Sequence, residues 1–275
     1  PGYVYIKYID VMPEGHQDLN YIEINGIQKV LISIVWIMPW INTVIRQMDY
    51  LEIDASFYAC APYKYCIYHS ITYNNSIPIA LSLHPFESSE LYNMIFEGML
   101  KHKLDYSNLE ENDVLSDLHP AIIKFCKDHK MNSNFCHRHY IEIFGSHSSY
   151  GIWAARILET KSYTEYLQVR ERINSEITAF LNKKIQLCGK ITKDCQEKID
   201  LLIIMFTDPN DSEVDISEIQ NSVYFIEKWA NWIRKEHHIP RCSNHCEDAH
   251  GNINITLKGK KKHLKKDLKK LLIMF

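Results

Sequence analysis

The stretch RCSNHCEDAHGNIN, residues 241–254, gathers two cysteines, two histidines and two acids into fourteen positions. Thiolates and imidazoles are the ligands that zinc prefers. Carboxylate oxygens are the ligands that magnesium and manganese prefer. The stretch therefore predicts either a zinc knuckle or the setting of one catalytic carboxylate, and the rest of the chain has to distinguish between the two.

Two further acids lie where strand patterns predict chemistry. Asp54 falls inside the β-branched and aromatic run 50–60, beside Ile53 and Phe57, where an ionised carboxylate is costly unless it is paired or binds a cation. An outward-facing strand residue is the alternative. Asp117 follows a short apolar strand and precedes a helix that should begin at about His119, so a helix N-cap is the alternative there.

The elements that must position these acids follow from hydrophobic periodicity. Alternating runs at 50–60, 63–73 and 77–86, with a turn at 74–76, predict three antiparallel strands. An amphipathic helix over 87–104, a strand over 113–116, a helix from about 119, and a strand and helix over 132–144 follow. This is the element order of a ribonuclease H-like core, an α/β fold with a mixed sheet flanked by helices. Its first and fourth strands are neighbours, so Asp54 and Asp117 should share one edge.

Long helical patterns, such as those over residues 163–185 and 222–238, then replace the strand patterns. We predict an N-terminal flanking segment, the first part of the core, an all-helical insertion before the last catalytic helix, that last core helix, and a basic tail, over residues 1–45, 46–146, 147–238, 239–257 and 258–275. The helix after the insertion can carry Glu247 back to the edge of Asp54 and Asp117. Three such carboxylates suit two Mg²⁺ or Mn²⁺ ions, which in phosphoryl transfer serve the attacking and the leaving oxygen.

An ordered set of motifs resembles the catalytic domain of Mutator-like element (MULE) transposases, which are of the DDE type. The set is EIDASF, IPIALSLHPFESSELYNMIFEGM, SDLHPAI, FCHRHYIEIF and SNHCEDAHGNIN, and it covers about residues 48–254. The family's recurring residues match Asp54, Asp117, Cys136 with His139, and Glu247, and Asn244 belongs to the Ser/Thr-Asn pair before the family's glutamate.

The resemblance implies a ribonuclease H-like fold and metal-dependent cleavage of double-stranded DNA at transposon ends. The freed 3′ hydroxyl would then be transferred into target DNA, which is DNA recombination by transposition. The family's N-terminal zinc-binding recognition module has no counterpart in the Cys/His spacing of residues 1–45.

Several residues keep alternative roles. Cys136 and His139 are either a structural pair or place an imidazole near the DNA backbone. With Cys242 and Cys246 they have the residue types of a zinc site, but the loose Cys-x-x-x-Cys spacing makes zinc the less favoured metal. His250 either orients the last helix, contacts a phosphate or is a plain surface residue, and Asp248 competes with its neighbour Glu247 as the ligand.

Charge is concentrated at the C-terminus. The net charge is −3, but residues 258–270 hold eight lysines against one aspartate, a net +7, which leaves −10 for the rest. We predict salt-sensitive phosphate binding by this tail, with Lys258, Lys260, Lys261, Lys262, Lys265 and Lys266 as contacts. A solvated basic helix or a nuclear targeting signal explains the tail as well. The acidic remainder favours a domesticated or decayed transposase that binds DNA without catalysis, whereas the three retained acids argue against decay.

The remaining expectations concern surroundings and partners. Eight cysteines without dense disulfide spacing predict reduced thiols in a cytosolic or nuclear protein and not a secreted one. We expect a nuclear location, with a cytoplasmic stage before import. The apolar run 30–41 is too short to span a bilayer and is interrupted by Ser33 and Pro39, so no membrane partner is expected.

Three tryptophans of the insertion could stack on bases, although core packing is the favoured role: Trp153, Trp229 and Trp232. A homodimer or higher oligomer on DNA is left open.

Overall fold

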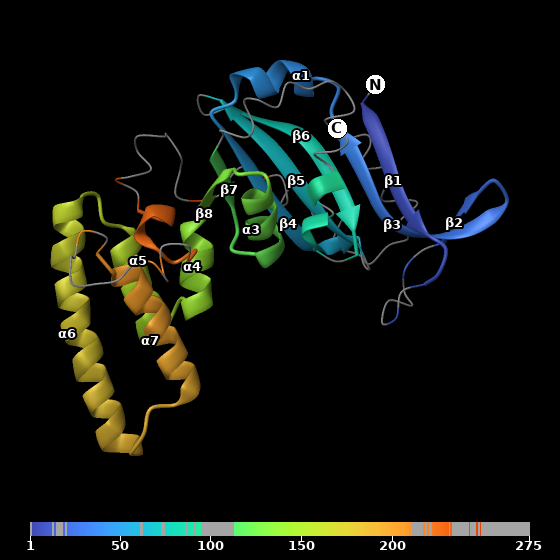
Figure 1. Cartoon of the computed structure of the whole chain (residues 1–275). Helices are drawn as coiled ribbons and strands as arrows, with labels where there is room; N and C mark the ends of the chain where they lie inside the picture. Colours follow the sequence, from blue (N-terminus) through green and yellow to red (C-terminus); the bar gives the residue numbers. More distant parts are fainter. Residues whose placement is uncertain are drawn as a thin grey trace. The chain divides into compact units, whose positions relative to one another are not determined.

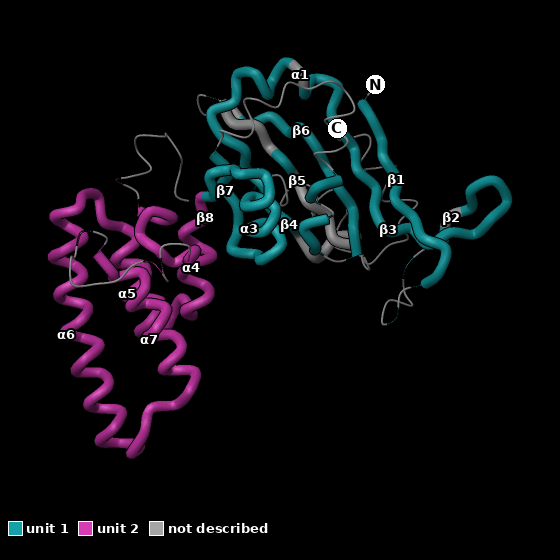
Figure 2. Tube along the Cα trace, in the orientation of Figure 1, with its two compact units in different colours: residues 1–133, 243–275 teal, residues 134–242 magenta. Residues whose placement is uncertain are grey.

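The computed structural model covers the whole chain and describes most of it. The described residues are 2–12, 14, 19, 21–60, 63–72, 75–85, 87–90, 92–94, 113–208, 210, 217, 219, 222–230, 232, 242, 246 and 248. Within these, side chains are not described at 22, 42, 56–60, 63–67, 69–72 and 75. The chain divides into two compact units, residues 1–133 with 243–275, and residues 134–242 (Figure 2).

The first unit is built on a mixed sheet (Figure 1). In the described part of the chain the sheet has eight strands, in the order β1-β3-β6-β5-β4-β7-β8, with β2 paired to β3. Their bounds are β1 Tyr3–Ile9, β2 Tyr21–Ile24, β3 Ile27–Ile37, β4 Tyr50–Cys60, β5 Tyr63–Thr72, β6 Asn75–His84, β7 Asp113–Ser116 and β8 Asn132–Phe135. With the helices between and after these strands, the chain has the α/β class that the sequence predicts.

The three strands predicted between residues 50 and 86 form the meander β4-β5-β6 with antiparallel pairing. β6 begins at Asn75, inside the stretch 74–76 predicted as the turn. β7 pairs with β4, so the strands of Asp54 and Asp117 are neighbours as predicted, and their pairing is parallel. The helix predicted over 87–104 is helical at Ser89, Glu90 and Tyr92–Met94, whereas residues 91 and 95–112 lie outside the described part.

The N-terminal residues extend this sheet beyond the elements that the sequence predicted. β3 joins β6 at one end, with Val35 opposite Ser82, and β1 lies along the other side of β3. The apolar run 30–41 is therefore mostly a sheet strand, buried from Val30 to Ile37. A strand buried on both faces has no polar alternation, which is why it reads as a continuous apolar run. Among the described residues, no helix is long and apolar enough to cross a membrane.

One face of the sheet carries the core of the first unit. Helix α3, Pro120–Asp128, buries Ile122 and Phe125 among residues of β4, β7 and β6, together with Tyr92. The short helix α1, Ile41–Val44, and the 3-10 turn η1, Ile45–Gln47, connect β3 to β4 and add to the same core. Alternation along β4 places Leu51 and Ile53 on this core face.

The second unit is helical in the described residues apart from the end of β8. Its helices are α4 His137–Phe144, α5 Ser149–Leu158, α6 Tyr163–Cys188 and α7 Lys193–Phe206, with the 3-10 turn η2 Ile226–Lys228. Ser148, Ser162 and Thr192 each cap a helix N-terminus with the side-chain oxygen. Gly189 ends α6 at φ 70°, a left-handed conformation in which glycine has no steric penalty.

The long helical pattern expected over 222–238 is wrong in its first half. Residues 222–230 form turns and η2 instead of a continuous helix. The Ser222 hydroxyl accepts a hydrogen bond from the amide of Tyr224, and the Trp229 indole donates to the carbonyl of Tyr224 (2.9 Å). These local bonds use backbone groups that a helix would need for itself.

Candidate carboxylate site

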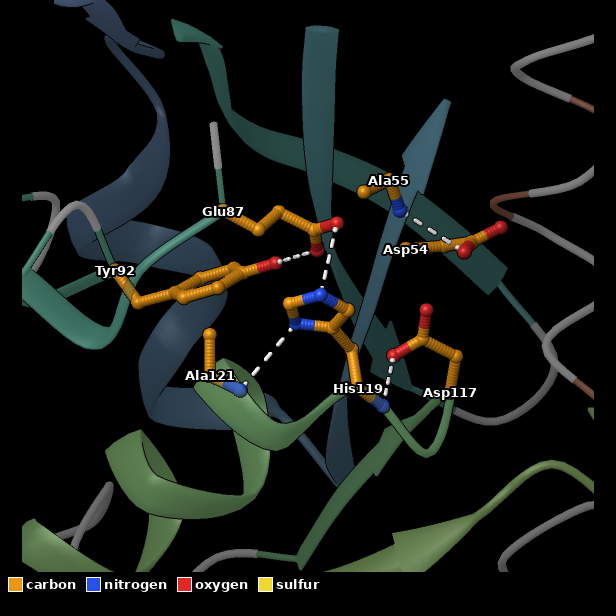
Figure 3. A network of polar contacts seen from close by, with 7 residues as sticks. All are labelled: Asp54, Ala55, Glu87, Tyr92, Asp117, His119 and Ala121. Carbon is orange, nitrogen blue, oxygen red and sulfur yellow. Dashed lines mark hydrogen bonds and ion pairs between the residues drawn. The ribbon is translucent and has the colours of Figure 1, made fainter. Parts of the chain in front are cut away.

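Asp54 and Asp117 lie next to each other at one end of the parallel pair β4 and β7. The last register pair of these strands is Ile53 with Ser116, and each aspartate follows directly on one member of it. Neighbouring strands are about 4.8 Å apart, so the two carboxylates leave the chain from adjacent positions. In Figure 3 the Asp117 carboxylate lies beside the Asp54 side chain. Two carboxylates this close repel each other unless a cation or a proton lies between them.

Asp54 belongs to the interior of the unit and is not the outward-facing residue of the alternative interpretation. Its exposed fraction is 6%, and one carboxylate oxygen accepts a hydrogen bond from the amide of Ala55 (2.9 Å). Strand alternation puts Asp54 on the same face as Glu52, opposite the core face of Leu51 and Ile53. The carboxylate is thus fixed on a buried strand, away from the packing of α3.

The N-cap of α3 is His119, not Asp117. The imidazole of His119 accepts a hydrogen bond from the amide of Ala121, and its ring nitrogen Nδ1 is the acceptor (3.3 Å). Asp117 lies two residues earlier, where its Oδ1 accepts from the amide of His119 (3.0 Å). The Ser116 hydroxyl donates to the Asp117 carbonyl (2.9 Å). Helix capping therefore does not account for Asp117.

The C-terminal stretch returns to β4 beside Asp54. The amide of Cys246 donates to Oε1 of Glu52 (2.8 Å), and the Cys246 thiol donates to the Glu52 carbonyl (3.6 Å). Both residues are 0% exposed. Since Glu52 and Asp54 share a face of β4, Cys246 is held on the Asp54 face of the sheet. Glu247, the next residue in the chain, lies outside the described residues, as do Asn244 and His250; Asp248 is helical and exposed.

Two buried acidic residues, Glu52 and Asp54, lie on this part of β4. Burial raises the pKa of Tyr50, and the nearby Glu52 raises it further. The Tyr50 hydroxyl therefore stays protonated at neutral pH. Glu52 was not singled out by the sequence, because in the run YLEID it looks like the polar half of an ordinary alternating strand.

The cysteine and histidine candidates for zinc are divided between the two units. Cys136, His139 and Cys242 belong to residues 134–242, and Cys246 belongs to the first unit. Cys136 is buried at the N-terminal end of α4, and His139 lies in the first turn of that helix, partly buried. Within the described part of the chain, which leaves out residue 247, no group of three or more His, Cys, Asp or Glu side chains could hold a metal ion.

The tryptophans of the helical unit lie mainly inside it. Trp229 is 0% exposed and Trp153 is 5% exposed. The carbonyl of Trp229 accepts a hydrogen bond from the buried ring of His137 (2.7 Å). These contacts give both tryptophans packing roles, as favoured from the sequence. The lysines of the tail, residues 258–270, lie outside the described residues.

The donor set at the end of β4 and β7 fits a hard divalent cation. Both groups are carboxylates, which supply the oxygen ligands that Mg²⁺ and Mn²⁺ take. A cation would also offset the repulsion between them. Comparison of the chain with models of known protein families, with curated proteins and with solved structures finds no match.

Proposed function

We propose that this chain is a transposase catalytic domain of the MULE type, a metal-dependent DDE enzyme that cleaves DNA at transposon ends and transfers the strand. The observation that carries the proposal is the placement of Asp54 and Asp117 directly after the paired residues Ile53 and Ser116 of two parallel strands. A carboxylate pair on adjacent strands can hold the metal ions that two-metal phosphoryl transfer uses.

The sheet order supports a ribonuclease H-like core as part of this proposal. Strands β4, β5 and β6 form an antiparallel meander, and β7 adds in parallel to β4 on the other side, followed by β8. The order β6-β5-β4-β7-β8 is the one expected if the five core strands begin at residue 50. The N-terminal strands β1 and β3 then extend the sheet next to β6.

Glu247 is proposed as the third ligand because of its position in the chain. It follows Cys246, whose amide is bound to Glu52 two residues before Asp54. Glu247 is thus one residue from an anchor on the Asp54 face of β4. His250 and Asn244, close to Glu247 in the sequence, are proposed to support that ligand, and Cys136 with His139 to act as accessory residues.

Each of the chain's own groups has a defined part in this chemistry. When bound, the two Mg²⁺ or Mn²⁺ ions would activate the attacking oxygen and stabilise the leaving oxygen. Asp54, held on a buried strand, and Asp117, held in the turn before α3, supply carboxylate oxygens at fixed positions. The lysines of residues 258–270 would bind DNA phosphates without reading sequence. The proposed setting is nuclear, on double-stranded DNA, with the oligomeric state left open.

The test is manganese-dependent nicking of supercoiled DNA by the full-length chain. Asp54→Asn should abolish nicking and leave DNA binding, measured by fluorescence anisotropy, unchanged. Asp49→Asn is the matched control, because it makes the same substitution at an exposed residue just before β4. Nicking by the Asp54→Asn variant at the wild-type rate would refute the proposed active site.

The second candidate is a domesticated or decayed transposase that binds DNA as a regulator without catalysis. The acidic charge outside the tail favours it. Salt-dependent DNA binding by the wild-type chain, with no nicking in Mn²⁺ or Mg²⁺ on any DNA end tested, would support this candidate over the enzyme.

A further inference from the structure

Glu87 is a buried glutamate near the aspartate pair that has no part in the proposed chemistry. The side chain of Glu87, just after β6, is 2% exposed. Its Oε1 accepts a hydrogen bond from the hydroxyl of the buried Tyr92 (2.6 Å), and its Oε2 lies 3.5 Å from Nε2 of His119. An ionised carboxylate at such a depth is stable only with partners of this kind. Figure 3 shows the Glu87 carboxylate next to the His119 ring, with the Tyr92 hydroxyl on one side and Asp54 on the other.

His119 lies between Glu87 and Asp117 and contacts both of them, as well as the amide of Ala121. Its ring Nδ1 accepts from the amide of Ala121, so in the neutral ring the proton is on Nε2, the nitrogen that faces Glu87. Its backbone amide donates to Oδ1 of Asp117. The orientation of one residue therefore determines both the start of α3 and the position of one oxygen of the proposed metal ligand.

We propose that Glu87 and His119 are positioning residues for Asp117. The Glu87 carboxylate lies 3.5 Å from Nε2, so it favours the tautomer with the proton on Nε2 and restricts the orientation of the ring. The fixed ring caps α3 through Nδ1, and the backbone amide of the same residue holds the Asp117 carboxylate toward Asp54. In metal sites, groups that hydrogen-bond to a ligand hold it in the orientation that binds the metal. Removing such a supporting group typically weakens metal affinity about 10-fold to 100-fold. The inference rests on the proposed metal-binding function.

The test is the Mn²⁺ affinity of the full-length chain, measured by the electron paramagnetic resonance signal of free Mn²⁺. His119→Ala should weaken binding about tenfold, and Glu87→Gln should weaken it several-fold. His119→Asn should recover part of the loss, because asparagine is a good N-cap. Glu90→Gln is the matched control, since Glu90 is an exposed glutamate close to Glu87 in the chain.

A double-mutant cycle separates positioning from general destabilisation. If Glu87 acts through His119, Glu87→Gln should have no further effect on Mn²⁺ affinity in the His119→Ala background. Equal effects in both backgrounds, or affinities equal to that of Glu90→Gln, would overturn the inference and leave the metal site standing. A wild-type chain that binds no Mn²⁺ would instead overturn the proposed function, and with it the role given to this pair.

Discussion

The amide of Cys246 donates a hydrogen bond to the carboxylate of Glu52, which joins two fully buried residues 194 positions apart. Glu52 is two residues before Asp54 on β4, so this bond brings the C-terminal stretch to the strand of the candidate site. At least one of the two cysteines in residues 241–254 thus has a structural role, since Cys246 is buried and bonded to β4.

Breaking this bond should expose Cys246. Glu52→Ala leaves a buried amide without its acceptor, which should cost about 1–3 kcal/mol of unfolding free energy. Glu52→Gln keeps an oxygen acceptor and should cost less. Thiol labelling with peptide mass mapping gives the local measurement: Cys246 should be protected in the wild type and reactive in Glu52→Ala, with the exposed Cys188 labelled in both. Equal labelling of Cys246 and Cys188 in the wild type would contradict the anchor.

Divalent cations should stabilise the folded chain through the two aspartates. A ligand at 100 times its Kd adds about 2.7 kcal/mol to the unfolding free energy. Calorimetry should show Mn²⁺ raising the Tm of the wild type and of Asp49→Asn. Asp54→Asn and Asp117→Asn should lose this shift. Without metal these two variants should melt at or above the wild-type temperature, because each removes one of two neighbouring like charges. A persistent Mn²⁺ shift in both would place the cation elsewhere.

The helical unit should lose stability in acid at Glu176. Hydrogen bonds from Arg156 lower the pKa of Glu176 below its ordinary value of 4.5, and the Trp153 indole also donates to it (2.9 Å). A folded pKa below the unfolded one gives stability that is fully present above about pH 4.5 and is lost as pH falls through the folded pKa. The side chain is 41% exposed, so solvent screening keeps the contribution below about 1 kcal/mol.

The measurement is the unfolding free energy against pH for Glu176→Gln and for Glu171→Gln, an exposed control on the same helix. Glu176→Gln should flatten the decline below about pH 4.5, whereas Glu171→Gln should follow the wild type. Identical acid profiles for the wild type and Glu176→Gln would show that the Arg156 contact adds no pH-dependent stability.

The basic tail should dominate the salt dependence of DNA binding. Each phosphate contact adds about 0.9 to the slope of log affinity against log salt on duplex DNA. Replacing the lysines of residues 258–270 with glutamine should therefore reduce the slope by several units. Replacing the exposed Lys183 and Lys190 in the helical unit is the control. A slope that is unchanged by the tail substitutions would assign DNA binding to another surface.

The sequence was informative where local pattern decides structure. Period-2 alternation predicts β4, β5 and β6, and the short apolar run before Asp117 predicts β7. These strands also predict that the two aspartates are neighbours, and the register of Ile53 with Ser116 is consistent with that expectation. The strand β3 was missed as a sheet element because a strand buried on both faces resembles any other short apolar run.

The sequence was uninformative where a contact joins distant residues or an unusual residue type fills a role. Glu52 and Cys246 have no local signal of their bond, since nothing near either residue depends on the other. His119 takes the N-cap position that an aspartate usually takes, so Asp117 seemed the better cap. The turns at 222–230 follow from side-chain bonds such as that of Ser222, which hydrophobic periodicity does not report.

Asp54, Asp117 and Glu247 are proposed to bind divalent cations. The most direct test is an anomalous-scattering map of crystals soaked in manganese, collected at energies that separate manganese from zinc. Manganese is expected between Asp54 and Asp117, with Glu247 as a further ligand. Zinc at Cys136, His139, Cys242 and Cys246 with no manganese at the aspartates, or neither metal at either place, would contradict it.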